Sequence, residues 1–579
     1  MGLDNDRLAA ESPDAKPALS SEQALPPKGG EADTLGEVEK GSTTPSVPPA
    51  PWKPSKEEWM LFFPLALTSF MVSLDATVII TSLPTIAEDL DASATSSFWI
   101  GTSYLLSCAV TMPFMASLSD IFGRPLCLTL SVFVFGGGTV VCAAAQNIDA
   151  MLAGRAIQGI GGGGIISLSL VILTDVVPLK FRPRYVGIIQ GAWAVGTCAG
   201  PIIGGALATR SRWRWVFYIM LPLAGAGAVT VPLMVRLKSR RSDDPWRVKV
   251  ARVDLVGAAL FISSATLVLI ALSRAGIQVP WSSAMTVGPL VGGSLGLVIT
   301  VFWERFVATT PFLKIALFCR KSAYGVYGGT FAQGFLLYGQ LYYSPLFFES
   351  VKLLGPLQTG VSLLPIMLTL TPASVAAGAL ITRWGHYRWA LWSGWGLVTL
   401  AEGLTIRWAA HTRAGEWIAT SMLLGLGHGL LLTAHNCASQ ATAPSGDEGA
   451  ATAFYALVRS LGMAMGVGII ACVFLNVIRA KCETRQIPPD VAANITSYAV
   501  RLKSMAPGHL RSAIMETYAG GFQGTSIFLS AVGGVAFGAC VWVRGFEIDK
   551  ELLSDHHIVS SRQGVTEDQS HIDVVMKAG

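Results

Sequence analysis

The chain has 579 residues, of which 51% are hydrophobic and only 14% are charged, and its formal net charge is +5. Soluble domains carry roughly 25% charged residues, so the chain lacks the polar surface that a soluble protein of this size needs. It shows no basic patch of the kind that binds nucleic acid, and no nucleic-acid partner is expected. The nine cysteines form no CxxC pair, so we expect neither a zinc site nor a disulfide framework, and no metal or cofactor.

The first 55 residues are expected to form a disordered cytoplasmic tail. The segment 12–55 is rich in Pro, Glu, Lys and Ser and lacks apolar periodicity, so it cannot bury enough apolar surface to fold. It also lacks the apolar core of a cleavable signal peptide, and none is expected.

Beyond this tail, long apolar runs alternate with short polar breaks. A membrane-spanning helix needs roughly 20 apolar residues, and about fourteen runs meet that requirement. The expected spans are Trp59–Leu83, Phe98–Ser117, Leu126–Ala145, Met151–Thr174, Tyr185–Ala208, Trp215–Val235, Leu255–Leu272, Met285–Trp303, Tyr324–Phe347, Gly360–Ile381, Trp389–Arg407, Trp417–Leu432, Thr452–Asn476 and Phe522–Val543. The pattern predicts an all-α polytopic protein embedded in the lipid bilayer.

Basic residues between the spans predict that both termini are cytoplasmic. With the N-terminus inside, most Arg and Lys fall in inner connections, above all in the basic loop 236–254, and this is the usual bias of membrane proteins. The stretch 479–521 then lies outside the cell, and its Asn494-Ile495-Thr496 is a glycosylation sequon on the permissive side. We expect the cell membrane, with the vacuolar membrane left open.

An internal repeat divides the spans into two related halves. The segment 378–385, GALITRWG, echoes the segment 116–123, ASLSDIFG, at an offset of 262 residues. The expected organisation is a six-helix half at 56–235, the loop 236–254, two inserted spans at 255–303, a second six-helix half at 304–543 and a cytoplasmic tail at 544–579. Repeats of this kind imply a central site between two halves that rock around it.

Two charged residues stand inside apolar spans of the first half. The segment 74–84, LDATVIITSLP, contains Asp75, and an intramembrane carboxylate costs about 2.5–3.5 kcal/mol on insertion scales, so it should face a cavity or a partner. The segment 155–161, RAIQGIG, places Arg155 in the fourth span, where its fixed positive charge favours the ionised form of a nearby acid. Both are candidates for proton coupling; the alternatives are a carboxylate that only caps or packs a helix and an arginine in a purely structural pair.

Two other segments carry conformational signals. The connection after the second span places Asp120, Gly123 and Arg124 beside helix ends, an arrangement that suits a latch between helices. The fifth span contains 196–205, GTCAGPIIGG, in which glycines four residues apart allow close helix approach and Pro201 bends the helix. By itself, the glycine spacing indicates only helix packing.

Together, these four segments resemble the signatures of the major facilitator superfamily, over about residues 59–543. Within it they resemble the fourteen-span drug:proton antiporters, and among those the fungal pumps that export toxins and secondary metabolites. The resemblance implies the major facilitator fold, with two six-helix halves plus two inserted helices. It also implies proton coupling through Asp75 and Arg155, and a latch in which Asp175, at the end of the fourth span, joins Asp120, Gly123 and Arg124.

The fifth-span segment completes the antiporter signature GxxxGPxxGG, which within the superfamily marks exporters. The residues concerned are Gly196, Gly200, Pro201, Gly204 and Gly205. The chain departs from the family pattern at Ala116, where Gly is usual, and at Pro125, where a second base is usual and whose absence predicts a weaker latch. Met220 replaces the usual Asn.

Further candidates lie outside these signatures. Glu402 in the span 389–407 and His428 in the segment 425–429, GLGHG, are candidate second proton sites, since His titrates near neutral pH. Glu402 could instead pair with Arg407 near the outer face. The ninth span carries aromatic and hydrogen-bonding side chains suited to a bulky amphipathic ligand, although packing alone would also explain them: Gln333, Tyr338, Gln340 and Tyr342.

The sequence therefore predicts proton-driven export of small amphipathic organic molecules such as toxins, secondary metabolites or drugs, by a monomer whose partners are the substrate, protons and lipid. It contains no phosphate-binding GxxxxGKS/T loop, so ATP is not the expected energy source. No nucleophile–base or metal constellation suggests an enzyme. A siderophore or vacuolar basic amino-acid transporter of the same fold remains an alternative, and so does a non-transporting nutrient sensor, which the short polar C-terminal tail disfavours.

Overall fold

The computed structural model describes residues 54–92, 94–208, 212–239, 245–276, 279–488, 491, 498, 502–503, 505–546, 548 and 556–558. The expected N-terminal tail 1–55 lies almost wholly outside the described residues. Asn494 and most of the C-terminal tail also lie outside them, so the expectations for these segments stay predictions.

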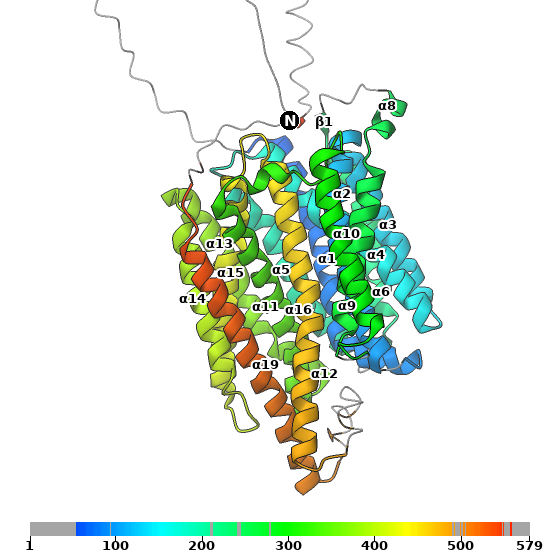
Figure 1. Cartoon of the computed structure of the whole chain (residues 1–579), viewed down its shortest axis with the longest axis vertical. Helices are drawn as coiled ribbons and strands as arrows, with labels where there is room; N and C mark the ends of the chain where they lie inside the picture. The colour runs from blue at the N-terminus through cyan, green and yellow to red at the C-terminus, as the bar shows by residue number, and fades with distance from the viewer. Residues whose placement is uncertain are drawn as a thin grey trace, which may run out of the picture. The chain divides into compact units, whose positions relative to one another are not determined.

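The described chain is almost entirely helical (Figure 1). The first half comprises α1 (Lys56–Asp89), α2 (Ala94–Phe122), α3 (Arg124–Ala144), α4 (Ile148–Val176), α5 (Arg182–Ala208), α6 (Trp215–Tyr218) and α7 (Met220–Met234). The short α8 (Trp246–Ala251) precedes the two inserted helices, α9 (Leu255–Arg274) and α10 (Ala284–Phe306). After a 3-10 turn, η1 (Ile315–Phe318), the second half comprises α11 (Lys321–Ser350), α12 (Pro356–Ser362), α13 (Leu364–Trp384), α14 (Arg388–Thr405), α15 (Ala414–Thr442), α16 (Glu448–Thr484) and α19 (His509–Val541).

A single pair of short strands accompanies the helices in the described residues. Strand β1 (Leu237–Ser239) lies in the basic loop and pairs antiparallel with β2 (His556–Ile558) of the C-terminal tail, with Leu237 opposite Ile558. The pairing connects the end of the first half to the tail.

Twelve helices in the described part of the chain are long and apolar enough to cross a membrane, with α6–α7 and α12–α13 each counted once. Helices α11 and α14 coincide with two more of the expected spans but fall outside this set. Gly and Tyr are frequent in α11, and Trp, Gly and polar residues interrupt the apolar residues of α14, which lowers the hydropathy of both. By length and composition, twelve of the fourteen expected spans are therefore candidate membrane spans in the described residues.

The helices on either side of the connection 479–521 extend further than the sequence indicated. The stretch 479–521 was expected to be a connection, but α16 continues to Thr484 and α19 begins at His509. Arg485 and Glu516 form an ion pair of 2.8 Å beside these ends, while Tyr518 is fully buried. Polar and aromatic contacts between the two helices stabilise turns that an apolar-run criterion cannot detect.

Helix contacts join the two halves as well as building each one. Within the halves, α1 packs along α5, α3 along α4, α13 along α15 and α11 along α16. Between the halves, α5 lies against α13, and both α2 and α4 lie against α16. The inserted helices pack on each other, and α9 also contacts α16 and α2.

Glycine allows the contact between α5 and α13 to be close at both ends. A Cβ on Gly378 would overlap the carbonyl of Pro183, near the start of α5. A Cβ on Gly360, just before α13, would lie 2.7 Å from the carbonyl oxygen of Pro201, near the end of α5. The halves therefore touch along most of the length of α5.

Candidate functional site

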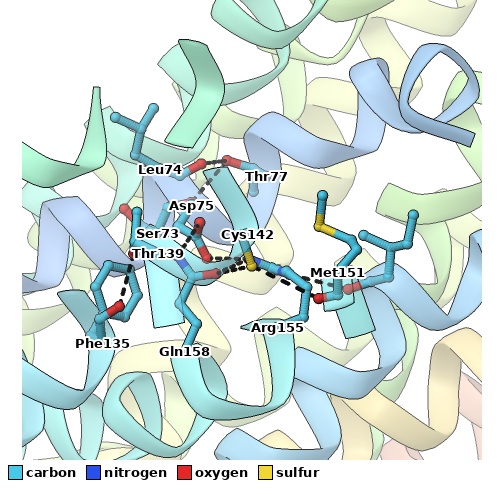
Figure 2. Close-up of polar contacts among 11 residues, drawn as sticks. Ser73, Leu74, Asp75, Thr77, Phe135, Thr139, Cys142, Met151, Arg155 and Gln158 are labelled. Carbon is cyan, nitrogen blue, oxygen red and sulfur yellow. Dashed lines mark hydrogen bonds and ion pairs between the residues drawn. The ribbon is translucent and has the colours of Figure 1, made fainter. Parts of the chain in front are cut away.

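A buried charged network connects α1 and α4 (Figure 2). Asp75 of α1 is 0% exposed and Arg155 of α4 is 1% exposed, and Arg155 Nη1 donates to Asp75 Oδ2 at 2.7 Å. Gln158, one turn further along α4, donates from Nε2 to Asp75 Oδ1 at 2.8 Å. Both carboxylate oxygens therefore have a hydrogen-bond partner, which offsets the cost of placing this charge away from water.

Several contacts fix the two α4 side chains in place. Arg155 Nε donates to the carbonyl of Ile100 at 3.1 Å, and its guanidinium carbon lies 4.2 Å from the centroid of the Tyr104 ring. Arg155 Nη1 also donates to Gln158 Oε1 at 2.6 Å, and Gln158 Nε2 donates to Thr139 Oγ1 of α3 at 2.9 Å. A planar group with several donors suits this arrangement, which a lysine ammonium could not reproduce.

Small residues of α3 and α4 bring the backbones close enough for these contacts. A Cβ on Gly138 of α3 would overlap the backbone of Gln158, and one on Gly159 of α4 would lie 2.5 Å from the carbonyl oxygen of Tyr104. The expected candidates Asp75 and Arg155 thus meet directly. Gln158 was not among them, although it belongs to the same RAIQGIG segment and could have been included on that ground.

The glycine-rich seam of α5 packs on the same helix that carries Asp75. A Cβ on Gly196 would overlap Ser73, one on Gly200 would overlap Thr77, and one on Gly204 would overlap the carbonyl of Val78. The contacted residues lie on either side of Asp75 along α1. The glycine seam therefore determines how closely α5 packs on the helix that carries Asp75.

The other residues of the same signature connect α5 to two neighbours. Thr81 Oγ1 donates to the carbonyl of Pro201 at 2.9 Å, which ties the proline position of α5 to α1. A Cβ on Gly205 would lie 2.9 Å from the carbonyl oxygen of Pro356, in the opposite half. The signature therefore lies where α5 meets both its own half and the other one.

A second charge cluster lies where α2 ends and α3 begins. Arg124 Nη2 is 2.6 Å from Asp120 Oδ1, and Arg124 Nε is 2.9 Å from Asp175 Oδ2 at the end of α4. Gly123 between the two helices has φ +100°, in the left-handed region that favours glycine. The structure thus places the four expected latch residues together and ties α2, α3 and α4 at one end.

Arg182 extends this end of the molecule across the two halves. Its Nη2 donates to the carbonyl of Thr174 at 2.6 Å, and its Nη1 donates to Gln440 Oε1 of α15 at 3.0 Å. Sequence reasoning did not select Arg182, although its place a few residues after Asp175 was a signal. A contact between halves beside the cluster is what a conformational latch requires.

The expected ligand-binding residues of α11 lie in different local settings. Gln333 is 1% exposed, and its Oε1 accepts from Arg459 Nε of α16 at 3.3 Å. The rings of Tyr338 and Tyr342 stack, with centroids 6.3 Å apart and an interplanar angle of 29°. Gln340 is buried as well.

Tyr342 also marks the meeting of the two halves. A Cβ on Gly101 of α2 would lie 2.8 Å from its hydroxyl oxygen. The Tyr338–Tyr342 pair therefore lies close to α2, the helix whose Ile100 accepts a hydrogen bond from Arg155. This is the interface between the halves, where a central site is expected.

Glu402 of α14 and His428 of α15 lie apart from the network on α1 and α4. Both are 0% exposed. In the described part of the chain, neither carboxylate oxygen of Glu402 and neither ring nitrogen of His428 has a hydrogen-bond partner. The alternative pairing of Glu402 with Arg407 is therefore not formed, and the role of both residues stays a prediction.

Comparison with known proteins identifies the architecture. The family model described as Major Facilitator Superfamily matches residues 65–467, which is more than half of the chain. The chain belongs to the major facilitator superfamily. This confirms the resemblance read from the four sequence segments.

Three similar curated relatives within the superfamily come from fungi. The chain is 36% identical over 495 residues to MFS transporter L2 of a Phoma species, covering 85% of the chain and 82% of the relative. It is 33% identical over 537 residues to efflux pump FUS6 of Gibberella fujikuroi, covering 90% of the chain and 96% of the relative. It is 38% identical over 419 residues to MFS efflux transporter aclA of Aspergillus oryzae, covering 72% of the chain and 75% of the relative.

Solved structures of major facilitator proteins share the fold at low sequence identity. The human organic anion transporter MFSD10 superposes with a TM-score of 0.55 at 17% identity, covering 84% of this chain and all of the other. The proton:xylose symporter XylE has a TM-score of 0.53 at 12% identity, covering 85% and 97%. The chain is thus a multi-span membrane transporter, and its fold and relatives are those of transporters rather than enzymes.

Proposed function

We propose that this major facilitator protein is a proton-coupled efflux transporter of small amphipathic organic molecules, such as toxins, secondary metabolites or drugs. The observation that carries the proposal is the buried contact of Asp75 with Arg155 and Gln158. Each carboxylate oxygen depends on a side chain of another helix. Any movement of α4 relative to α1 would leave the carboxylate in an apolar setting, where binding a proton is favoured.

Export as the direction is supported by two independent features. Two of the three relatives are named as efflux proteins. The α5 segment completes the GxxxGPxxGG signature, which within the superfamily marks exporters. It packs against α1 on either side of Asp75, so closing or loosening that seam would act on the helix that carries Asp75.

Fourteen spans with both termini in the cytoplasm complete the proposal. Helices α11 and α14 lie among helices that qualify as spans, since α11 packs along α16 and α14 packs against α15 and α19. With α11 and α14 crossing, an even number of spans places both ends of the chain on one side, and the basic loop 236–254 favours the cytoplasmic side.

The test is dye accumulation in cells that express the protein and in matched cells that lack it. Probes are anionic, neutral and cationic fluorescent amphipathic dyes, with and without a protonophore. We expect lower accumulation of at least one dye in expressing cells, and loss of this difference when the protonophore removes the proton gradient. Higher accumulation in expressing cells would indicate import, and export insensitive to the protonophore would contradict proton coupling.

A further inference from the structure

Arg459 is a cation inside the second half that has no acidic partner among the described residues. It follows the start of α16 at Glu448 by three turns, or roughly 16 Å of helix, and so lies well within the span. Its Nε donates to Gln333 Oε1 at 3.3 Å. Among the described residues it forms no ion pair, in contrast to Arg155, which is paired with Asp75.

The groups around Arg459 are also incompletely paired. Gln333 is 1% exposed, and its Nε2 has no partner in the described part of the chain. His428 is fully buried, and neither of its ring nitrogens has a hydrogen-bond partner among the described residues. The charge of Arg459 also acts electrostatically on the imidazole of His428 and the phenol of Tyr338. Buried polar groups normally have partners, so this cluster from α11, α15 and α16 points to a ligand that completes it.

The same cluster adjoins an aromatic surface. Tyr338 stacks on Tyr342, and Tyr342 reaches Gly101 of the first half. A molecule lying between the halves could therefore place an apolar or aromatic body on the tyrosines and a hydrogen-bond acceptor on Arg459 and Gln333. A guanidinium matches the two oxygens of a carboxylate particularly well.

We infer that Arg459, together with Gln333, binds an anionic group of the transported molecule, so that the preferred substrates are amphipathic organic acids. The inference rests on the proposed export function and narrows its substrate class. Arg459 is half-buried, and a fixed cation at such a position repels cationic molecules, which disfavours basic amino acids as substrates. The competing explanation is a structural arginine neutralised by a carboxylate of its own half, for which Glu402 is the unpaired candidate.

The first test measures the thermal unfolding midpoint, Tm, of the purified full-length protein without ligand. Arg459→Gln removes a charge that has no ionic partner, and we expect an unchanged or higher Tm. Arg155→Gln, the matched control, leaves Asp75 buried without its partner and should lower the Tm by several degrees. A decrease for Arg459→Gln as large as that of the control would assign Arg459 a structural role and overturn the inference.

The second test uses three probes with one aromatic body: 4-(1-pyrenyl)butyrate, its primary amide and the corresponding butylammonium. The carboxylate should stabilise the wild-type protein more than the other two. Arg459→Gln should weaken carboxylate binding by about tenfold or more and leave amide binding unchanged, because a charge-assisted hydrogen bond is lost. Equal binding of all three probes by the wild type, no binding of the carboxylate, or unchanged carboxylate affinity in the variant would each overturn the inference.

These binding measurements need no proton gradient and no transport. Their failure would leave export and coupling in place, whereas failure of the dye-accumulation experiment would leave the anion preference of the purified protein in place. The two proposals are therefore tested separately.

Discussion

At the scale of single residues, Asp75 differs from other acidic side chains of the same helix in how completely it is enclosed. Its two oxygens are bonded to Arg155 and Gln158, and it is 0% exposed. Asp89, at the far end of α1, contacts Trp213 and Arg214 but remains about half exposed, and the indole N–H donated by Trp213 lowers the pKa of its carboxyl. One helix thus offers a buried candidate for coupling and an exposed control.

We predict that Asp75→Asn abolishes proton-driven transport and leaves substrate binding largely intact. The amide keeps the size of the side chain but cannot take up a proton and release it. The measurement is uptake of a transported dye into proteoliposomes under an imposed pH gradient, together with dye binding to the purified variant.

Asp89→Asn is the matched control and should keep its pH-dependent uptake, because its carboxylate is only a surface contact. If Asp75→Asn still concentrated the dye with the pH dependence of the wild type, coupling would reside elsewhere. Glu402, which is buried without a hydrogen-bond partner among the described residues, would then be the next residue to replace.

The residue scale also shows what a sequence can and cannot indicate. Asp75 and Arg155 could be selected because an isolated charge in an apolar run is costly, so two of them in one half suggest a pair. The interaction of Arg459 with Gln333 could not be selected in this way. Their positions are 126 residues apart, and only the packing of α16 on α11 brings them together.

At the scale of elements, the α1–α5 seam is the feature most sensitive to side-chain volume. A Cβ on Gly200 would overlap Thr77, whereas a Cβ on Gly191 of the same helix would meet nothing within 4 Å. The contrast separates the effect of helix propensity from the effect of packing.

We predict that Gly200→Ala lowers stability by about 1–3 kcal/mol through overpacking and reduces transport, because α1 and α5 are pushed apart beside Asp75. Gly191→Ala should be neutral or slightly stabilising, since alanine favours helix. The measurements are the Tm of each purified variant and the initial rate of dye export. Equal Tm values for the two variants would show that the seam tolerates a methyl group.

We predict that the connection between α2 and α3 has a conformational rather than a folding role. Asp120 is 53% exposed, so its ion pair with the buried Arg124 contributes little to stability, and Asp175 still contacts Arg124 without it.

We therefore predict that Asp120→Asn reduces the transport rate more than it reduces membrane insertion or Tm. Asp149→Asn, at the exposed start of α4, is the control and should leave both quantities unchanged. Transport at the wild-type rate by normally inserted Asp120→Asn protein would show that this charge does not act between conformational states.

Element boundaries were the least predictable feature of the fold. Apolar runs located every long helix in the described part of the chain, but α11 and α14 are less apolar than the twelve candidate spans. The ends of α16 and α19 depend on contacts such as Arg485 with Glu516, which join residues of two helices. A search for apolar runs within one segment cannot detect contacts between two helices.

At the scale of the whole molecule, the two halves must separate at one end while they close at the other if they rock around a central site. In the described structure, the halves meet near Arg182 and Gln440 and again near Gly205 and Pro356, at opposite ends of α5. The hydrogen bond from Arg182 to Gln440 is thus one of the contacts that must break when its end opens.

Cys437 provides a reporter for that opening. It is 3% exposed and lines the same small pocket as Leu179, Arg182 and Gln440. We predict that Gln440→Ala speeds the reaction of Cys437 with N-ethylmaleimide by roughly tenfold, because losing a hydrogen bond to a charged group shifts the equilibrium toward the open state.

Peptide mass spectrometry distinguishes Cys437 from the other cysteines. Cys142, buried beside Gln158 within the first half, is the internal control and should react at its wild-type rate. Faster reaction of both cysteines would indicate general unfolding, and an unchanged rate at Cys437 would show that the Arg182–Gln440 contact does not hold this end closed.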